Sequence, residues 1–193
     1  MPLIDRADSL LIVIDAQPGF AGPSDATSLD AARAREVAAW LTGVAAALGV
    51  SIVVTEEDTA TNGPTDPAIA THLPPGTPIL PKAVFGLADD PAIMEAVEST
   101  GRRTAILVGA ETDVCVAQSA IGLADRGFRV VVVSDATFSP GSMHDHGLAH
   151  LRDAGVDVRH AKGIYYEWIM TLAAARAFQD EHPELTSPPS FDL

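Results

Sequence analysis

The sequence predicts an α/β fold, a doubly wound parallel sheet of six strands with helices on both faces. Apolar runs of strand length alternate with helical segments along the 193 residues. The runs are largely continuous and rich in β-branched residues, as in strands that are buried on both faces. Glycine follows most of the helical segments, where a helix typically stops. This alternation is typical of βαβ units that build a parallel sheet.

Each element follows from its own local pattern. The predicted strands, taken in order, are residues 9–15, 51–56, 79–85, 104–110, 128–136 and 156–161. Thr27 and Asp30 have capping-box spacing before a first helix of about 20 residues, which Gly49 ends. The later helices are predicted at residues 90–99, 114–126, 142–154 and, as one final helix, 165–178.

The strand order decides which segments meet. The commonest doubly wound order is 3-2-1-4-5-6, which gives a Rossmann-like three-layer sandwich. In that order the first and fourth strands are neighbours, and ligands bind outside their carboxyl ends. Asp15 ends the first predicted strand and Cys115 follows the fourth, so both are expected at this crevice. The turn after Asp15 lacks the glycine pattern of a dinucleotide site.

Composition narrows the partners. The net charge of −14 argues against nucleic acid and anionic membranes, which favour basic surfaces, and its ordinary explanation is solubility. The expected partner is a small-molecule substrate. The single cysteine excludes an intrachain disulfide and favours a reducing cytoplasm. The N-terminal segment has no basic region before its apolar run and predicts no signal peptide. No apolar run is long enough to predict a membrane span.

The length predicts one domain with a single core. We assign residues 1–180 to it, and the Pro-rich residues 181–193 to a C-terminal tail. Residues 56–78 form a long segment rich in Pro, Gly, Thr and Asp, and loops of this length are often functional. They are expected to shape the mouth of a pocket.

Three side chains could form a catalytic group at the crevice. A thiol in the first turn of a helix is favoured as a thiolate, and Asp15 is placed to take the proton of Cys115. Lys82 would stabilise both anions, provided that its loop folds back towards the first strand. Each residue also has an ordinary alternative. Asp15 could be a turn residue, Lys82 a solvated charge and Cys115 a small core residue.

Three segments resemble those of the isochorismatase-like cysteine hydrolases, a superfamily that includes nicotinamidases, N-carbamoylsarcosine amidohydrolases and isochorismatases. "GAETDVCVAQSAIGLADRGFRVVVVSDA" is similar to the family's nucleophile segment. "LLIVIDAQPGF" resembles its first strand with an Asp-x-Gln-x-x-Phe signature, and "PKAVFG" resembles the segment of its lysine. The segments occur in the family's order, and the resemblance covers roughly residues 8–170.

The resemblance implies a catalytic triad and an acyl-enzyme mechanism. Cys115 would be the nucleophile, Asp15 the general base and Lys82 the third member. The backbone N–H groups of Glu111 and Cys115 would form the oxyanion hole, with a cis peptide bond between Ala110 and Glu111. The side chains that would line the pocket are Gln17 and Phe20.

The chain also departs from the family. Nicotinamidases have an Asp-x-His metal site after the second strand, where this chain reads "TEEDTATNG", so we expect no metal and no cofactor. The alternative is a metal site on the helix with His144, His146 and His150, of which the last two have i, i+4 spacing.

The predicted function is hydrolysis of a C–N bond in a small amide or carbamoyl compound. The alternatives are an isochorismatase-type vinyl-ether hydrolase and a catalytically silent scaffold or binding protein on the same fold. Family members usually assemble, so a homo-oligomer is expected. Trp168, Ile169 and Phe178 could build its interface or simply pack onto the sheet.

Overall fold

The computed structural model describes residues 2–21 and 24–193 and places six parallel strands in one sheet. Their order is β3-β2-β1-β4-β5-β6, as predicted. The strands are β1 (Ser9–Ile14), β2 (Ser51–Glu57), β3 (Ile79–Lys82), β4 (Thr104–Ala110), β5 (Arg129–Phe138) and β6 (Asp157–Arg159). All six residues of β1 and all seven of β4 are buried, because helices cover both faces of the sheet.

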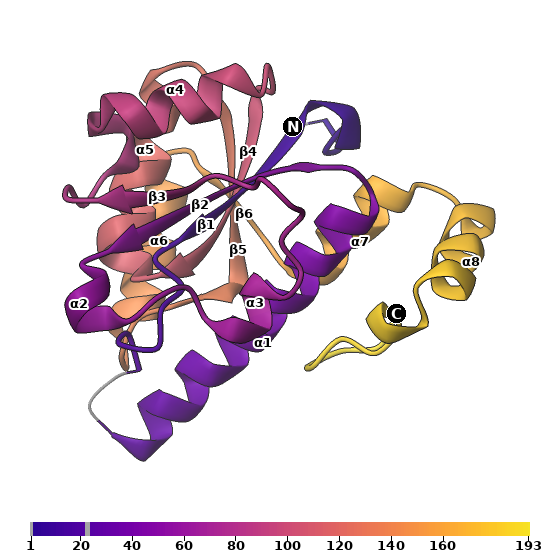
Figure 1. Cartoon of the computed structure of the whole chain (residues 1–193), viewed down its shortest axis with the longest axis horizontal. Helices are drawn as coiled ribbons and strands as arrows, with labels where there is room; N and C mark the ends of the chain where they lie inside the picture. The colour runs from indigo at the N-terminus through magenta and orange to yellow at the C-terminus, as the bar shows by residue number, and fades with distance from the viewer. Residues whose placement is uncertain (1, 22–23) are drawn as a thin grey trace.

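Eight α-helices surround the sheet in the described part of the chain (Figure 1). They are α1 (Asp25–Ala47), α2 (Thr59–Asn62), α3 (Pro67–Ala70), α4 (Pro91–Ser99), α5 (Ala117–Asp125), α6 (Met143–Asp153), α7 (Ala161–Ile169) and α8 (Leu172–Glu181). None of the described helices is long and apolar enough to cross a bilayer.

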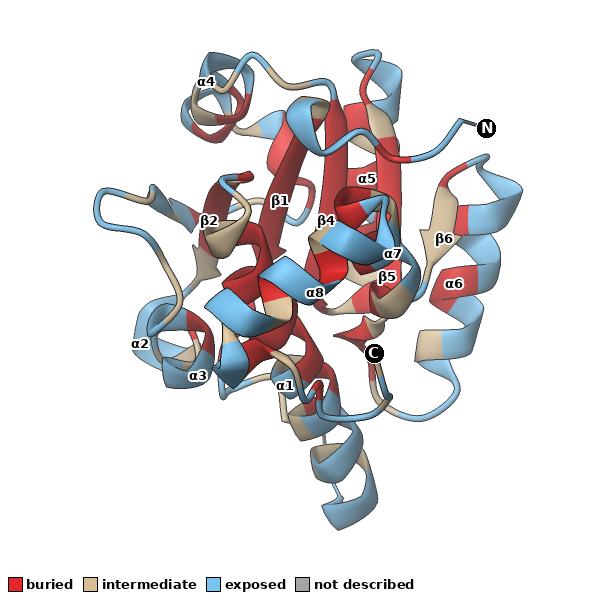
Figure 2. Cartoon of the chain, turned by 90° about the vertical axis from the view of Figure 1, so that its right-hand side faces the viewer, coloured by how far each residue is buried: buried red, intermediate tan, exposed pale blue. Residues whose placement is uncertain are grey.

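Two apolar cores lie on the two faces of the sheet. Alternate residues of β1 supply them: Leu11 and Val13 pack with α1, α7 and α8, whereas Leu10 and Ile12 pack with α4, α5 and α6. Figure 2 shows the buried strands at the centre and the exposed outer surfaces of α6 and α8. This sandwich leaves the carboxyl edge of the sheet open to the loops.

The first helix begins earlier than the sequence predicts. Ser24, not Thr27, is its N-cap, and the capping box joins Ser24 to the Thr27 side chain. The Ser24 backbone is extended, as is typical of an N-cap, and its side chain accepts a hydrogen bond from the Thr27 N–H. The helix ends as predicted, with Gly49 at a positive φ just after it.

The predicted final helix 165–178 is wrong as a single element. It is divided at Met170, which has a φ of 67°, and Thr171 caps the start of α8. The reversal allows Trp168 and Ile169 of α7 and Phe178 of α8 to enter the same core. These three side chains therefore pack inside the chain and are not available to build an interface.

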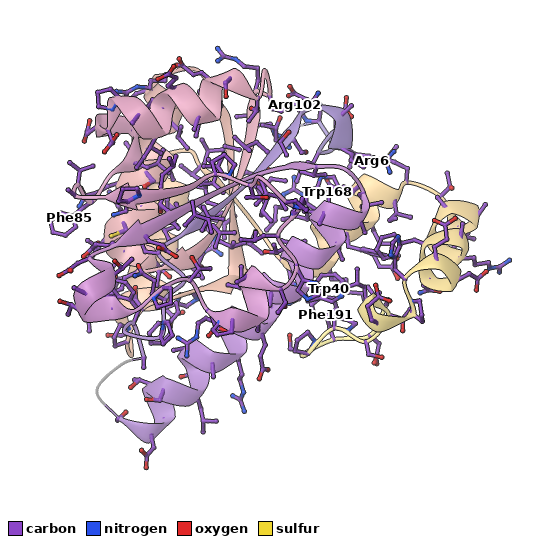
Figure 3. All side chains as sticks on the ribbon, in the orientation of Figure 1. Arg6, Trp40, Phe85, Arg102, Trp168 and Phe191 are labelled. Carbon is purple, nitrogen blue, oxygen red and sulfur yellow. The ribbon has the colours of Figure 1, made fainter. Side chains whose placement is uncertain are left out.

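The C-terminal segment packs against α1. The Trp40 indole N–H donates to the Leu185 carbonyl at 2.8 Å, and its ring meets Phe191 edge to face at 5.1 Å between centroids. Figure 3 shows Phe191 close to Trp40 at the end of the chain. Residues 182–193 thus add to the layer formed by α1 and α7.

Candidate active site

The structure brings Asp15, Lys82 and Cys115 together at the carboxyl edge of the sheet. Asp15 follows β1, Lys82 ends β3, and Cys115 lies in η3 (Thr112–Val116), a π-helical turn between β4 and α5. The Lys82 Nζ is 2.9 Å from Asp15 Oδ2 and 3.6 Å from Cys115 Sγ. All three side chains are buried.

Close contact between β1 and β4 makes this arrangement possible. Gly109 has a φ of 122°, and a Cβ at this position would lie 1.8 Å from the Ile14 carbonyl oxygen. Only glycine allows the two strand ends to approach so closely. The approach places the residue after Ile14, which is Asp15, beside the turn that holds Cys115.

Lys82 reaches the site by the length of its side chain, not by a loop that folds back. It extends from the edge strand across the end of β2 towards Asp15. Its ammonium also donates to the carbonyl oxygens of Val84 at 2.6 Å and Phe85 at 3.3 Å. Burial disfavours the ammonium, but Asp15, together with smaller effects of Cys115 and Glu57, outweighs burial, and the pKa of Lys82 lies above its ordinary value.

Asp15 is fixed from two sides. The Thr55 hydroxyl donates to its Oδ1 at 2.8 Å, and Lys82 contacts its Oδ2. Burial raises the pKa of Asp15 above its ordinary value, against the opposing effects of Lys82 and Thr55. A carboxyl group whose proton affinity is raised in this way is better suited to accept a proton than a solvated one.

The Cys115 thiol is protonated at neutral pH in the resting site. Burial and the carboxylates of Asp15 and Glu57 raise the pKa of Cys115 to about 12, although Lys82 lowers it. The nucleophilic form of cysteine is the thiolate. Attack on a substrate therefore has to be accompanied by transfer of this proton to a neighbouring group.

Glu57 is a fourth member of the site, and the sequence analysis missed it. The Cys115 thiol donates to Glu57 Oε2 at 3.3 Å, and Lys82 Nζ lies 3.4 Å from the same oxygen. Glu57 is also the register partner of Lys82 between β2 and β3. In the sequence, its run of acids predicts the start of a loop, whereas β2 continues to Glu57.

Gln17 holds the backbone of Glu57. Its side-chain oxygen accepts from the Glu57 N–H at 2.8 Å, and its side-chain nitrogen donates to the Glu57 carbonyl at 3.0 Å. Asn62 donates to the same carbonyl at 3.0 Å. Gln17 and Phe20 also line a small cavity beside α1, together with Gly109. Gln17 is thus placed to orient an acidic residue of the site.

A hollow of about 650 Å³ opens at the ends of β2 and β3. Its lining is Glu56, Glu57, Asp58, Thr59, Ala60, Pro81, Lys82, Ala83, Val84, Phe85 and Asp90. Glu57 and Lys82 border the hollow and also contact the sulfur. Figure 3 shows Phe85 directed outward from the segment after β3. The predicted pocket segment, residues 56–78, contributes its first residues, including part of α2.

The turn before Cys115 has the backbone that the resemblance implies. The Ala110–Glu111 peptide bond is cis. Among residues 2–21 and 24–193, the Glu111 N–H has no hydrogen-bond acceptor. The Glu111 carboxyl is half-buried, and burial together with the nearby Asp113 and Glu57 raises its pKa above the ordinary value. A backbone N–H without an acceptor can stabilise a developing oxyanion.

The alternative histidine site is not assembled. His146 and His150 are exposed on α6, while His144 is half-buried and its Nδ1 lies 2.9 Å from the Thr112 hydroxyl. Burial lowers the pKa of His144. Within the described residues, the one cluster with metal-ligand geometry is Asp15, Glu57 and Cys115, whose ligand atoms lie within 4.8 Å of one another. The Lys82 ammonium contacts all three side chains and offsets part of their negative charge.

Comparisons with known proteins give a family and related structures of the same fold. A model described as the isochorismatase domain matches residues 9–162. Isochorismatase domain-containing protein 2 of Bos taurus is 30% identical over 135 residues, which is 69% of this chain and 64% of that protein. The match thus spans slightly less than two thirds of this relative.

Two solved structures have the same fold. YcaC from Pseudomonas aeruginosa, solved with hexane-2,5-diol and covalent acrylamide, has a TM-score of 0.80 at 21% identity over 95% of this chain and 93% of its own. The Escherichia coli YcaC gene product, described as an octameric hydrolase of unknown specificity, has a TM-score of 0.80 at 21% identity, over 96% and 93%.

Proposed function

We propose that this chain, which belongs to the isochorismatase domain family of hydrolases, cleaves a C–N bond of a small amide or carbamoyl compound. The reaction would pass through a covalent intermediate on Cys115. The supporting observation is the contact of one buried thiol with Lys82 and Glu57, at 3.6 and 3.3 Å, beside buried Asp15. A solitary core cysteine needs no such charged neighbours.

In the proposed reaction Cys115 Sγ attacks the carbonyl carbon while Asp15, within 4.8 Å, accepts the thiol proton. The carbonyl π electrons move to oxygen, where the N–H groups of Glu111 and Cys115 stabilise the negative charge. The C–N bond then breaks, and the leaving nitrogen takes the proton from Asp15. Water attacks the thioester, gives a proton to Asp15, and the C–S bond breaks. The thiolate finally recovers that proton.

In this scheme Lys82 stabilises negative charge, and Gln17 holds the backbone of Glu57 in place. The ammonium offsets the second negative charge that arises when thiolate and carboxylate coexist. Gln17 fixes the end of β2 and, with it, the acidic side of the site. None of these steps uses a cofactor, and the single unpaired cysteine is in keeping with a reducing cytoplasm as the place of action.

A screen of small amides and carbamoyl compounds with purified protein tests the proposal. At least one should be hydrolysed, and brief acid quenching followed by intact-mass measurement should reveal an acyl adduct on Cys115. Acrylamide is a useful probe, because a structure of P. aeruginosa YcaC contains it covalently bound. Turnover of a vinyl ether without any adduct would favour the isochorismatase-type alternative. An inert thiol and no turnover would favour the scaffold alternative.

We also propose that the protein is a homo-oligomer, as E. coli YcaC is described as an octamer. Tyr166, Met170 and Leu172 at the junction of α7 and α8 are 40%, 65% and 78% exposed, and Leu3 is 60% exposed. These apolar side chains replace Trp168, Ile169 and Phe178 as candidates for an interface. Light scattering should give a mass above the 20.1 kDa of one chain, and Met170→Glu should lower it. A monomer at micromolar concentration would contradict this proposal.

A further inference from the structure

We propose that Glu57 selects the substrate by charge, together with three neighbouring acidic residues of the hollow, Glu56, Asp58 and Asp90, which we call the acidic wall. Neutral or cationic amides would reach Cys115, and anionic ones would be excluded. The inference deepens the proposed function and rests on it, since it assigns a substrate class to the same thiol. It makes Glu57 a specificity-determining residue.

Glu57 is the acidic residue that both lines the hollow and contacts the sulfur. Its carboxylate contacts Cys115 Sγ at 3.3 Å, and its side chain is 26% exposed, whereas the side chain of Asp15 is fully buried. Gln17 and Asn62 hold its backbone, and Lys82 Nζ lies 3.4 Å from the same carboxylate oxygen. A substrate whose carbonyl carbon approaches the sulfur therefore passes close to a negative charge.

The rest of the lining adds to this charge. Glu56, Asp58 and Asp90 also border the hollow, and Lys82 is its one basic lining residue in the described part of the chain. The Lys82 charge is matched by Asp15 at 2.9 Å. The acidic groups are thus not balanced within the lining, and a concave surface of one sign concentrates ligands of the opposite sign.

The remaining lining residues describe the body of the substrate. Pro81, Ala83, Val84 and Phe85 form an apolar side, and the Phe85 ring is 57% exposed. A compound with a small apolar part and an uncharged or amino-bearing end fits both sides. A carboxylate next to the scissile bond would lose hydration and meet Glu57 without a free cation to pair with.

A cation in the hollow would also favour the reactive thiolate. The carboxylates of Asp15 and Glu57 help to raise the pKa of Cys115. A positive charge on the ligand offsets them and makes loss of the thiol proton easier. The acidic wall would then affect both access to the sulfur and its reactivity, in the same direction.

The single cysteine permits a test that needs no knowledge of the substrate. Three methanethiosulfonates of different charge are used: a trimethylammonioethyl, a methyl and a sulfonatoethyl reagent. Each thiolate attack forms a disulfide and releases methanesulfinate, so the same reaction is followed by mass in every case. Rates are divided by those of N-acetylcysteine amide, an uncharged thiol reference, with the same reagent, which removes intrinsic differences in reactivity.

In the wild-type protein the normalised rate for the cationic reagent should exceed that for the anionic one by at least about tenfold. Glu57→Gln should reduce this ratio several-fold and accelerate the neutral reagent, because it removes a carboxylate that raises the pKa of Cys115. Glu95→Gln, an equal change of charge on the exposed face of α4, should leave all three rates unchanged. Urea unfolding of each variant checks that its fold is retained.

The outcomes separate the two proposals. Modification of Cys115 without preference for charge, or an equal preference in Glu57→Gln, would overturn the role of Glu57 but not the proposed function. A preference for cations in a protein that hydrolyses no amide would support charge selection at the thiol and contradict the proposed function. Modification of Cys115 only in denaturant would show that the hollow does not lead to the sulfur. That result would contradict both the charge selection and the proposed hydrolysis at Cys115.

Discussion

Replacement of Cys115 by alanine is expected to abolish hydrolysis, with a loss of at least about a thousandfold on any amide that the protein turns over. The change removes the atom that forms the covalent intermediate. Asp15 and Glu57 can accept protons in this scheme, but neither takes the place of the sulfur as nucleophile. The measurement is steady-state hydrolysis with the compound found in the screen, together with intact mass after quenching. No adduct should remain.

The fold should survive this change. The thiol is small and 2% exposed, so its removal should alter the free energy of unfolding by about 1–2 kcal/mol at most. Asp15→Asn is the matched comparison, because it keeps size while removing the proposed base, and it should be nearly as damaging. If Cys115→Ala retained a substantial part of the wild-type rate, covalent catalysis would be excluded.

Replacement of Lys82 by methionine should have the largest effect on stability. It removes the cation at 2.9 Å from Asp15 and 3.4 Å from Glu57 and leaves the buried Asp15 carboxylate without its cation. Breaking a buried pair from one side typically costs about 3–5 kcal/mol. Urea unfolding should show this loss, and hydrolysis should also fall sharply.

The pH dependence and a double variant distinguish this cause from poor packing of methionine. Lys82 lowers the pKa of Asp15, so its removal lets that pKa rise further, and the carboxyl can be protonated at mild acidity. The loss should therefore be smaller at pH 5 than at pH 8, since stability tied to a raised carboxyl pKa declines as pH rises. Asp15→Asn combined with Lys82→Met should recover much of the loss. If the loss in free energy of unfolding were the same at pH 5 and pH 8, the electrostatic explanation would be wrong.

The sheet could be predicted because its signals are local and repeated. Buried strands read as continuous apolar runs, and the commonest strand order then placed Asp15 and Cys115 side by side. Lys82 is expected from the sequence to reach them only through a loop that folds back, whereas its reach depends on side-chain length and not on position in the sheet. What these three residues had in common was a place at, or just after, a strand end.

Glu57 and the division at Met170 could not be found in this way. The face on which Glu57 lies depends on how far β2 continues, and a run of acids at a strand end gives no sign of that. The break between α7 and α8 is settled by packing, because Phe178 reaches the core only when the chain reverses. Helix propensity favours continuation through 165–178, and tertiary contacts override it.

The position of the two tryptophans has a practical consequence for fluorescence. Trp40 bonds to the Leu185 carbonyl, and Trp168 donates to the Ser9 hydroxyl at 3.1 Å, both in the core on the α1 and α7 side of the sheet. Cys115 belongs to the core on the other side. Indole emission therefore reports the docking of the C-terminal segment and the integrity of one layer. Substitutions around the thiol leave this optical signal intact, which makes it an internal reference for comparing their folded populations.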